Sequence, residues 1–147
     1  MKKVMCISSS GGHWVQLMKI TEGLSNCELI YISTDESLKS QVKQSTFYKV
    51  LDANMWSKMK LVKLFFQMFF IILKVRPKVI ISTGAAPGFF GVFVGKLLGI
   101  KTIWIDSIAN SDELSLAGIK VVKLATYTLT QWRHLESNNV IFKGSVL

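Results

Sequence analysis

The stretch that decides the fold is Cys6–Leu17, "CISSSGGHWVQL", in which an apolar run ends in three serines, two glycines and a histidine. Residues 3–8, "KVMCIS", predict a strand, and the residues from Gly12 to Leu24 predict a helix. Glycine adopts backbone angles that other residues avoid, which suits a tight turn between the two. The stretch therefore predicts a strand that leads directly into a helix, the repeating unit of parallel sheets.

The same alternation continues to the end of the chain. Further strands are expected at 28–34, 45–50, 78–83, 101–107, 125–130 and 139–145. Further helices are expected at Glu36–Lys43, Ser57–Val75, Pro87–Leu98 and Leu114–Leu124. Because the strands are short, apolar and β-branched, we expect helices to cover both faces of the sheet. The pattern predicts an α/β fold, a Rossmann-like, doubly wound parallel sheet in a single domain over residues 1–147.

Composition limits the classes of partner. The chain has 147 residues, is 50% hydrophobic and carries a net charge of +9, which favours an anionic partner such as phosphate, an acidic membrane face or nucleic acid. No signal peptide is apparent, so we expect Cys6 and Cys27 to be reduced thiols of a cytosolic protein. Because the Cys and His spacing fits no zinc motif, we expect no metal. We also expect no cofactor, since neither G-x-G-x-x-G nor G-K-[ST] occurs.

Three polar loops are expected to meet at one edge of the sheet. In the strand order 3-2-1-4-5, ligands bind outside the carboxyl ends where the order reverses. The loops that follow the first, fourth and fifth strands read "SSSGGH", "STGAAPG" and "IDSIANSDE". Serine hydroxyls and free amides at helix N-termini suit phosphate oxygens. The residues predicted to bind a phosphate or acceptor are Ser9, Ser10, Gly11, Gly12, Thr83, Gly84, Ala85 and Ser107. Ordinary tight turns between strands and helices account for these loops equally well.

Two residues at this edge are candidate catalytic groups. His13 begins the first helix, and an imidazole with an ordinary pKa near ~6.5 suits a general base. Asp106 ends the fifth strand at the same edge and is the rival base. His13 is equally consistent with a residue that caps the helix.

The helix expected at Ser57–Val75 is apolar around most of its circumference. Lys60, Lys63, Gln67 and Lys74 share one narrow stripe, whereas a surface helix needs an apolar stripe of only ~100°. The surplus indicates contact with lipid or another protein, and the surrounding cations favour an anionic leaflet. Lys63 and Lys74 bracket a segment of ten residues, interrupted by Gln67, which is too short to span a bilayer. The predicted membrane contacts are Lys58, Lys60, Lys63, Phe66, Phe69 and Lys74. A buried central helix with snorkelling lysines is the alternative.

Glycines punctuate the helix that follows "STGAAPG". Gly88, Gly91, Gly95 and Gly99 recur at intervals of three or four residues and so lie on one face. We expect this face to pack closely against the sheet or against a neighbouring element.

The ordered motifs resemble a known family. "SSSGGHWVQL", "RPKVIISTGAAPG", "GIKTIWIDS" and "QWRHLE" near "VIFKGS" occur in this order over nearly the whole chain. The set resembles the acceptor-side subunit of the two-component N-acetylglucosaminyltransferase of the dolichol pathway, and its bacterial relatives in capsule and exopolysaccharide synthesis. The resemblance implies the N-terminal half of a GT-B glycosyltransferase, peripheral on the cytoplasmic face of the membrane, where it binds a polyprenyl-diphosphate-linked acceptor. It also implies a separate small partner that binds the UDP-sugar.

This chain departs from the family pattern at several positions. Asp106 replaces the usual glutamate, "IANSDE" lacks an arginine, and "AGIK" replaces a Thr-Gly-Lys-like stretch. No N-terminal anchor segment is apparent, so attachment is expected to depend on the helix at Ser57–Val75. Three functions stay open: a glycosyltransferase subunit inactive without its partner, a catalytically silent membrane scaffold or enhancer of that partner, and an unrelated Rossmann nucleotide binder. Nucleic-acid binding is disfavoured because the basic cluster is interleaved with an apolar helix.

Overall fold

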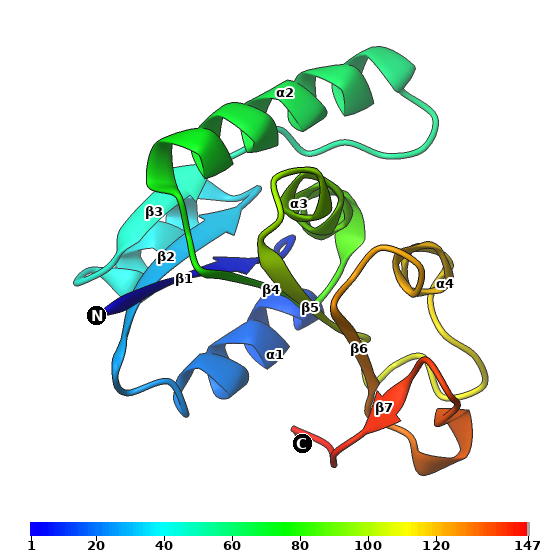
Figure 1. Ribbon diagram of the computed structural model, residues 1–147. Helices are drawn as coiled ribbons and strands as arrows, with labels where there is room; N and C mark the ends of the chain where they lie inside the picture. Colours follow the sequence, from blue (N-terminus) through cyan, green and yellow to red (C-terminus); the bar gives the residue numbers. More distant parts are fainter. Residues whose placement is uncertain (147) are drawn as a thin grey trace.

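A single parallel sheet organises the chain (Figure 1). The computed structural model describes residues 1–146, so the final residue of the expected domain lies outside the described part. The strands are β1 (Lys2–Ile7), β2 (Cys27–Ser33), β3 (Thr46–Lys49), β4 (Val79–Ser82), β5 (Lys101–Ile105), β6 (Tyr127–Thr130) and β7 (Ile141–Phe142). Their order is β3-β2-β1-β4-β5-β6-β7, with neighbours parallel. The expected Rossmann-like sheet and its reversal of order beside β1 are therefore confirmed.

Helices cover both faces of the sheet (Figure 1). They are α1 (Gly12–Thr21), η1 (Glu36–Val42), α2 (Lys58–Val75), α3 (Ala85–Leu97), α4 (Leu116–Val121) and the short η2 (Arg133–Leu135). On one face, Trp14 and Leu17 of α1 share a core with Leu38 of η1. On the other face, α2 buries Leu64, Met68, Ile72 and Val75 against the sheet, and α3 lies beside it.

Several expected boundaries were wrong. The first helix ends at Thr21 rather than Leu24, because a turn in which the Gly23 amide donates to the Ile20 carbonyl closes it. The segment expected as Glu36–Lys43 is a 3₁₀-helix, and the helix expected at Leu114–Leu124 shrinks to α4. The third to seventh strands are all shorter than expected. The Ser115 hydroxyl accepts from the Gly118 amide and so sets the start of α4.

Three glycines of α3 allow this helix to lie directly on the sheet, as expected. A Cβ at Gly91 would come within 2.3 Å of the Ile7 Cδ1, and one at Gly95 within 2.5 Å of the Thr102 Cγ2. Gly88 is in similarly close contact with Ser82. Gly99 does not share this role, since it lies past the helix end with φ +70° and open space around it. Close packing of α3 holds its N-terminus at the carboxyl edge.

We predict that Gly95→Ala destabilises the chain. Alanine adds ~1 kcal/mol of helix propensity over glycine, but overpacking a core costs ~1–3 kcal/mol. The close contact is with Thr102, whose hydroxyl accepts from the Thr126 amide and resists rotation. A net loss in the free energy of unfolding is expected in urea titrations.

Gly23→Ala is the matched control, because its Cβ would meet only the Ile20 carbonyl oxygen at 3.5 Å. This variant should change stability by less than ~0.5 kcal/mol. An equal urea midpoint for the Gly95 variant and the wild-type chain would contradict close packing of α3.

Candidate functional site

The loops after β1 and β4 meet at the carboxyl edge of the sheet. The Thr83 hydroxyl donates to the His13 carbonyl oxygen at 2.6 Å, and the Ser9 Oγ lies 2.9 Å from the His13 Nδ1. The imidazole fits here only because residue 84 is glycine, since a Cβ on Gly84 would lie 2.7 Å from Nε2. The structure therefore brings together Ser9, His13, Thr83 and Gly84, as the sequence predicted.

His13 is poised as a neutral imidazole. Desolvation by burial lowers its pKa from the ordinary value of 6.5, and the negative charge of Asp106 opposes this in part. Where Nδ1–H donates to Ser9, Nε2 is left to accept a proton. Among the described residues, no side chain caps the N-terminus of α1, so the His13 ring does not act as a helix cap.

Asp106 is held differently, inside a network of donors. Its Oδ1 accepts from the Trp104 Nε1 at 3.0 Å and from the Ser115 hydroxyl at 2.6 Å. Its Oδ2 accepts from the Ser115 amide at 2.9 Å and from the Asn110 Nδ2 at 3.3 Å. The side chain is only 2% exposed. A carboxylate with both oxygens engaged is better suited to anchoring the loop before α4 than to accepting a substrate proton, so the geometry favours His13 over this rival base.

A pair of buried amide side chains connects the loops, and neither was predicted to belong to the site. The Gln16 Nε2 donates to the Ser107 hydroxyl at 3.1 Å, and its Oε1 accepts from the Ile108 amide at 3.3 Å and from Gln131. The Gln131 Nε2 also donates to the Asp106 carbonyl oxygen at 3.0 Å. The only available signal was a polar residue on the buried face of the first helix. The pair ties α1 to the loops after β5 and β6.

The other predicted phosphate-binding residues divide into two groups. Ser10, Gly11 and Gly12 are exposed at the tip of the loop after β1, where a ligand can reach them. Ala85 has φ 65° at the start of α3, whose N-terminus carries no side-chain cap among the described residues. By contrast, the Ser107 hydroxyl accepts from Gln16 and from the Ala109 amide and is buried. Ser107 is thus engaged inside the protein.

The outer face of α2 is apolar and exposed, so the alternative of a buried central helix is wrong. Met59, Val62, Phe66, Phe70 and Leu73 recur at helical spacing and are 41–75% exposed. Lys58, Lys60, Lys63 and Lys74 are exposed around them. Of the predicted membrane residues, Phe69 differs because it is half-buried and packs against the core. The Gln67 side chain is bound to the chain itself, because its Oε1 accepts from the Leu51 amide at 2.9 Å.

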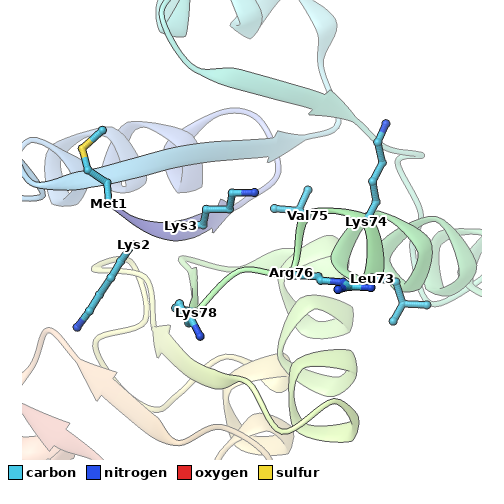
Figure 2. Close-up of a pocket in the computed structure, with 8 residues that line it drawn as sticks. All are labelled: Met1, Lys2, Lys3, Leu73, Lys74, Val75, Arg76 and Lys78. Carbon is cyan, nitrogen blue, oxygen red and sulfur yellow. The ribbon is translucent and has the colours of Figure 1, made fainter.

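A basic hollow of about 800 Å³ lies at the opposite, amino edge of the sheet. Figure 2 shows its cationic side chains coming from β1, from the end of α2 and from the segment that leads into β4. They are Lys2, Lys3, Lys74, Arg76 and Lys78. None of the residues that line it is acidic, and Leu73 links it to the exposed face of α2.

Two negative findings complete the geometry. Within residues 1–146, no group of three His, Cys, Asp or Glu side chains is arranged to hold a metal ion. Over the same residues, no helix combines the length and hydropathy needed to cross a bilayer.

Comparison with known proteins identifies the family. The family described as "Oligosaccharide biosynthesis protein Alg14 like" matches residues 4–146. The chain belongs to this Alg14-like family. Among curated proteins, the UDP-N-acetylglucosamine transferase subunit ALG14 of Candida albicans is 36% identical over 70 residues. The matched segment covers 44% of this chain and 32% of that relative.

Solved structures share the fold of this Alg14-like chain. MurG of Acinetobacter baumannii superposes with a TM-score of 0.81 at 13% identity, over 97% of this chain and 46% of MurG. The UDP-N-acetylglucosamine 2-epimerase of Rickettsia bellii gives a TM-score of 0.74 at 14% identity, over 99% of this chain and 45% of the epimerase. The chain thus spans about half of each, and its fold is that of one Rossmann-like half of a GT-B glycosyltransferase.

We predict that His13 titrates below pH 6.5. Burial disfavours the charged imidazole, so the folded pKa lies below the unfolded value. This residue's contribution to folding is then complete above about pH 6.5 and declines as the pH falls from there toward the folded pKa. NMR titration of the ring protons, assigned with His13→Gln, checks this. A midpoint at or above 6.5 would show that the ring is not desolvated.

Proposed function

We propose that this Alg14-like chain is the acceptor-side subunit of a two-component glycosyltransferase. It binds a polyprenyl-diphosphate-linked saccharide at the membrane and recruits a small partner that holds the UDP-sugar. The supporting observation is the GT-B-like half fold, whose carboxyl edge carries an accessible histidine between two glycine-containing loops. The proposed setting is bacterial capsule or exopolysaccharide synthesis on the cytoplasmic face of the membrane.

In this function the chain's own residues supply acceptor binding and a base. The exposed amides and hydroxyls around Ser10, Gly11 and Gly12, with the uncapped start of α3, suit diphosphate oxygens. His13 then either takes the proton of the attacking acceptor hydroxyl at Nε2 or positions the diphosphate. Gln16, Gln131 and Asp106 act through the loops that they fix.

The membrane contact is proposed to be the exposed apolar face of α2. The aromatic and aliphatic side chains supply burial, and the cations around them attract anionic headgroups at ~1 kcal/mol per charge. The cations of the amino-edge hollow lie at the C-terminal end of α2 (Figure 2), and Lys58 and Lys60 lie at its start, so both ends carry basic charge. A helix with this surface lies along the interface.

A catalytically silent scaffold is the second candidate. It is favoured by the engagement of Asp106 and Ser107 inside the protein, which leaves His13 as the single candidate base among the predicted residues. The effect of replacing His13 on the rate of sugar transfer therefore distinguishes the transferase from the scaffold.

The transfer prediction concerns the reconstituted pair. The chain alone should transfer no sugar, and the chain with its small UDP-sugar-binding partner should glycosylate a polyprenyl-diphosphate-linked saccharide. His13→Ala should lower the rate ~10²–10⁴-fold, the usual contribution of a positioned base. Radiolabelled sugar transfer checks this, with Val15→Ala on the exposed side of α1 as control. Turnover by the chain alone would refute the two-component function, and a loss under threefold for His13→Ala would favour the scaffold.

The membrane prediction uses vesicles that contain phosphatidylglycerol. Phe66→Ser with Phe70→Ser should weaken binding at all salt concentrations, because each buried aromatic side chain contributes ~1.5–3 kcal/mol. Lys58→Glu with Lys60→Glu should weaken it mainly at low salt, because exposed charges are screened beyond ~10 Å at 0.1 M. Vesicle co-sedimentation checks both effects.

Matched controls lie on other faces of the molecule. Val15→Ser with Tyr127→Ser removes exposed apolar surface of similar exposure, and Lys19→Glu with Lys43→Glu reverses charge on the opposite layer. Equal losses in these controls would refute α2 as the contact.

A further inference from the structure

An apolar groove of about 370 Å³ runs between α2, α3 and α4, beside the carboxyl-edge loops. Its walls include Leu61 of α2, Phe89 and Phe90 of α3 and Leu116 of α4. The polar side chains among its lining residues are Asn54 and Lys120. A groove this apolar fits a hydrocarbon rather than a sugar or a nucleotide.

One end of the groove reaches the candidate site. Ala85, which follows Gly84 next to the His13 imidazole, is also a lining residue of the groove. The amides of the first turn of α3 lack intrahelical acceptors and point out of the helix end, where the dipole favours an anion. Lys120 adds a formal positive charge at the groove itself. The first turn of α3 and Lys120 therefore make the groove complementary to a negatively charged group.

Phe90 connects the groove with the exposed face of α2 through a series of aromatic rings. The Phe90 ring lies 6.0 Å from the Phe65 ring, which lies 5.3 Å from the Phe66 ring. Phe66 in turn stacks with Phe70 at 6.5 Å. Since Phe66 and Phe70 are 50% and 63% exposed, an apolar path runs from the groove to the surface proposed to meet the membrane.

We infer that the groove binds the first part of the hydrocarbon chain of the lipid carrier, next to its diphosphate. The inference rests on the proposed function and names the part of the acceptor that this surface recognises. An amphiphile with one anionic end and one apolar chain matches both the positive charge beside Ala85 and at Lys120 and the path of rings that starts at Phe90. The volume is near the lower limit of ~300–1,000 Å³ for ligand pockets, so the groove takes only the segment nearest the diphosphate.

Binding of farnesyl diphosphate to the purified full chain tests the inference by calorimetry, below the concentration at which the lipid aggregates. Farnesyl diphosphate should bind more tightly than either inorganic diphosphate or farnesol. Ala117→Phe, which fills the groove, should weaken farnesyl diphosphate about tenfold or more and leave inorganic diphosphate unchanged, since only the apolar contact is lost.

Because Ala117→Phe can disturb the fold, a second pair of variants uses exposed side chains. Leu116→Asn removes an apolar wall from a side chain that is 68% exposed, so the fold should survive. Ile119→Asn is the matched control, because this residue is on the same short helix and 52% exposed but does not line the groove. We expect weaker farnesyl diphosphate binding for Leu116→Asn and wild-type binding for Ile119→Asn.

Three results would overturn the inference. They are equal affinity for farnesyl diphosphate and inorganic diphosphate, equal affinity in all variants, and the same affinity and variant pattern for a single-chain phosphatidylglycerol. The last result would assign the groove to a bilayer lipid. Sugar transfer by the reconstituted pair to a short-alkyl diphosphate acceptor is measured separately. A negative result for lipid binding in the groove therefore leaves the transferase function testable, and a negative result for transfer leaves the groove inference testable.

Discussion

The pairing of β1 with β4 is the constraint on which the rest of the structure depends. Strands are added toward β3 on one side of this pair and toward β7 on the other. The helices α1 and α3 therefore leave adjacent strand ends toward opposite faces of the sheet (Figure 1). The two loops are then close enough for the Thr83 hydroxyl to bond the His13 carbonyl oxygen. Residues 70 positions apart thereby share one site, and no shorter segment of the chain contains it.

Several buried polar side chains near the site edge form hydrogen bonds with one another. Gln16, Gln131 and Asp106 hold the loops after β5 and β6 with hydrogen bonds that are buried and therefore costly to break. Of the two candidate bases, His13 is the one that this network does not hold, and burial favours its neutral form. The nearby thiol of Cys6 does not act as a base, since burial raises its pKa to about 12 and leaves it protonated. A neutral imidazole beside a fixed carboxylate suits the acceptor-side function proposed above.

The layer of α2, α3 and α4 carries a second constraint. Glycines let α3 lie on the sheet, and this brings its phenylalanines beside those of α2. Seven phenylalanine rings then form one connected cluster that is buried on its inner side and exposed on its outer side. An exposed apolar surface of this kind is unfavourable in water and marks an interaction surface.

The sequence alone determined the class of fold and the three polar loops, because hydrophobic periodicity and glycine turns are local signals. The strand order around the switch point was expected from the usual order of doubly wound sheets, and the pairing of β1 with β4 confirms it. The sequence also determined that α2 has more apolar surface than one sheet face covers, since that count needs only a helical wheel. Only the tertiary structure decided which of those residues face outward, so that Phe70 replaced Phe69 as an exposed aromatic. It also decided the roles of Asp106, Ser107 and Gln16, because hydrogen bonds between residues about 90 positions apart leave no local pattern.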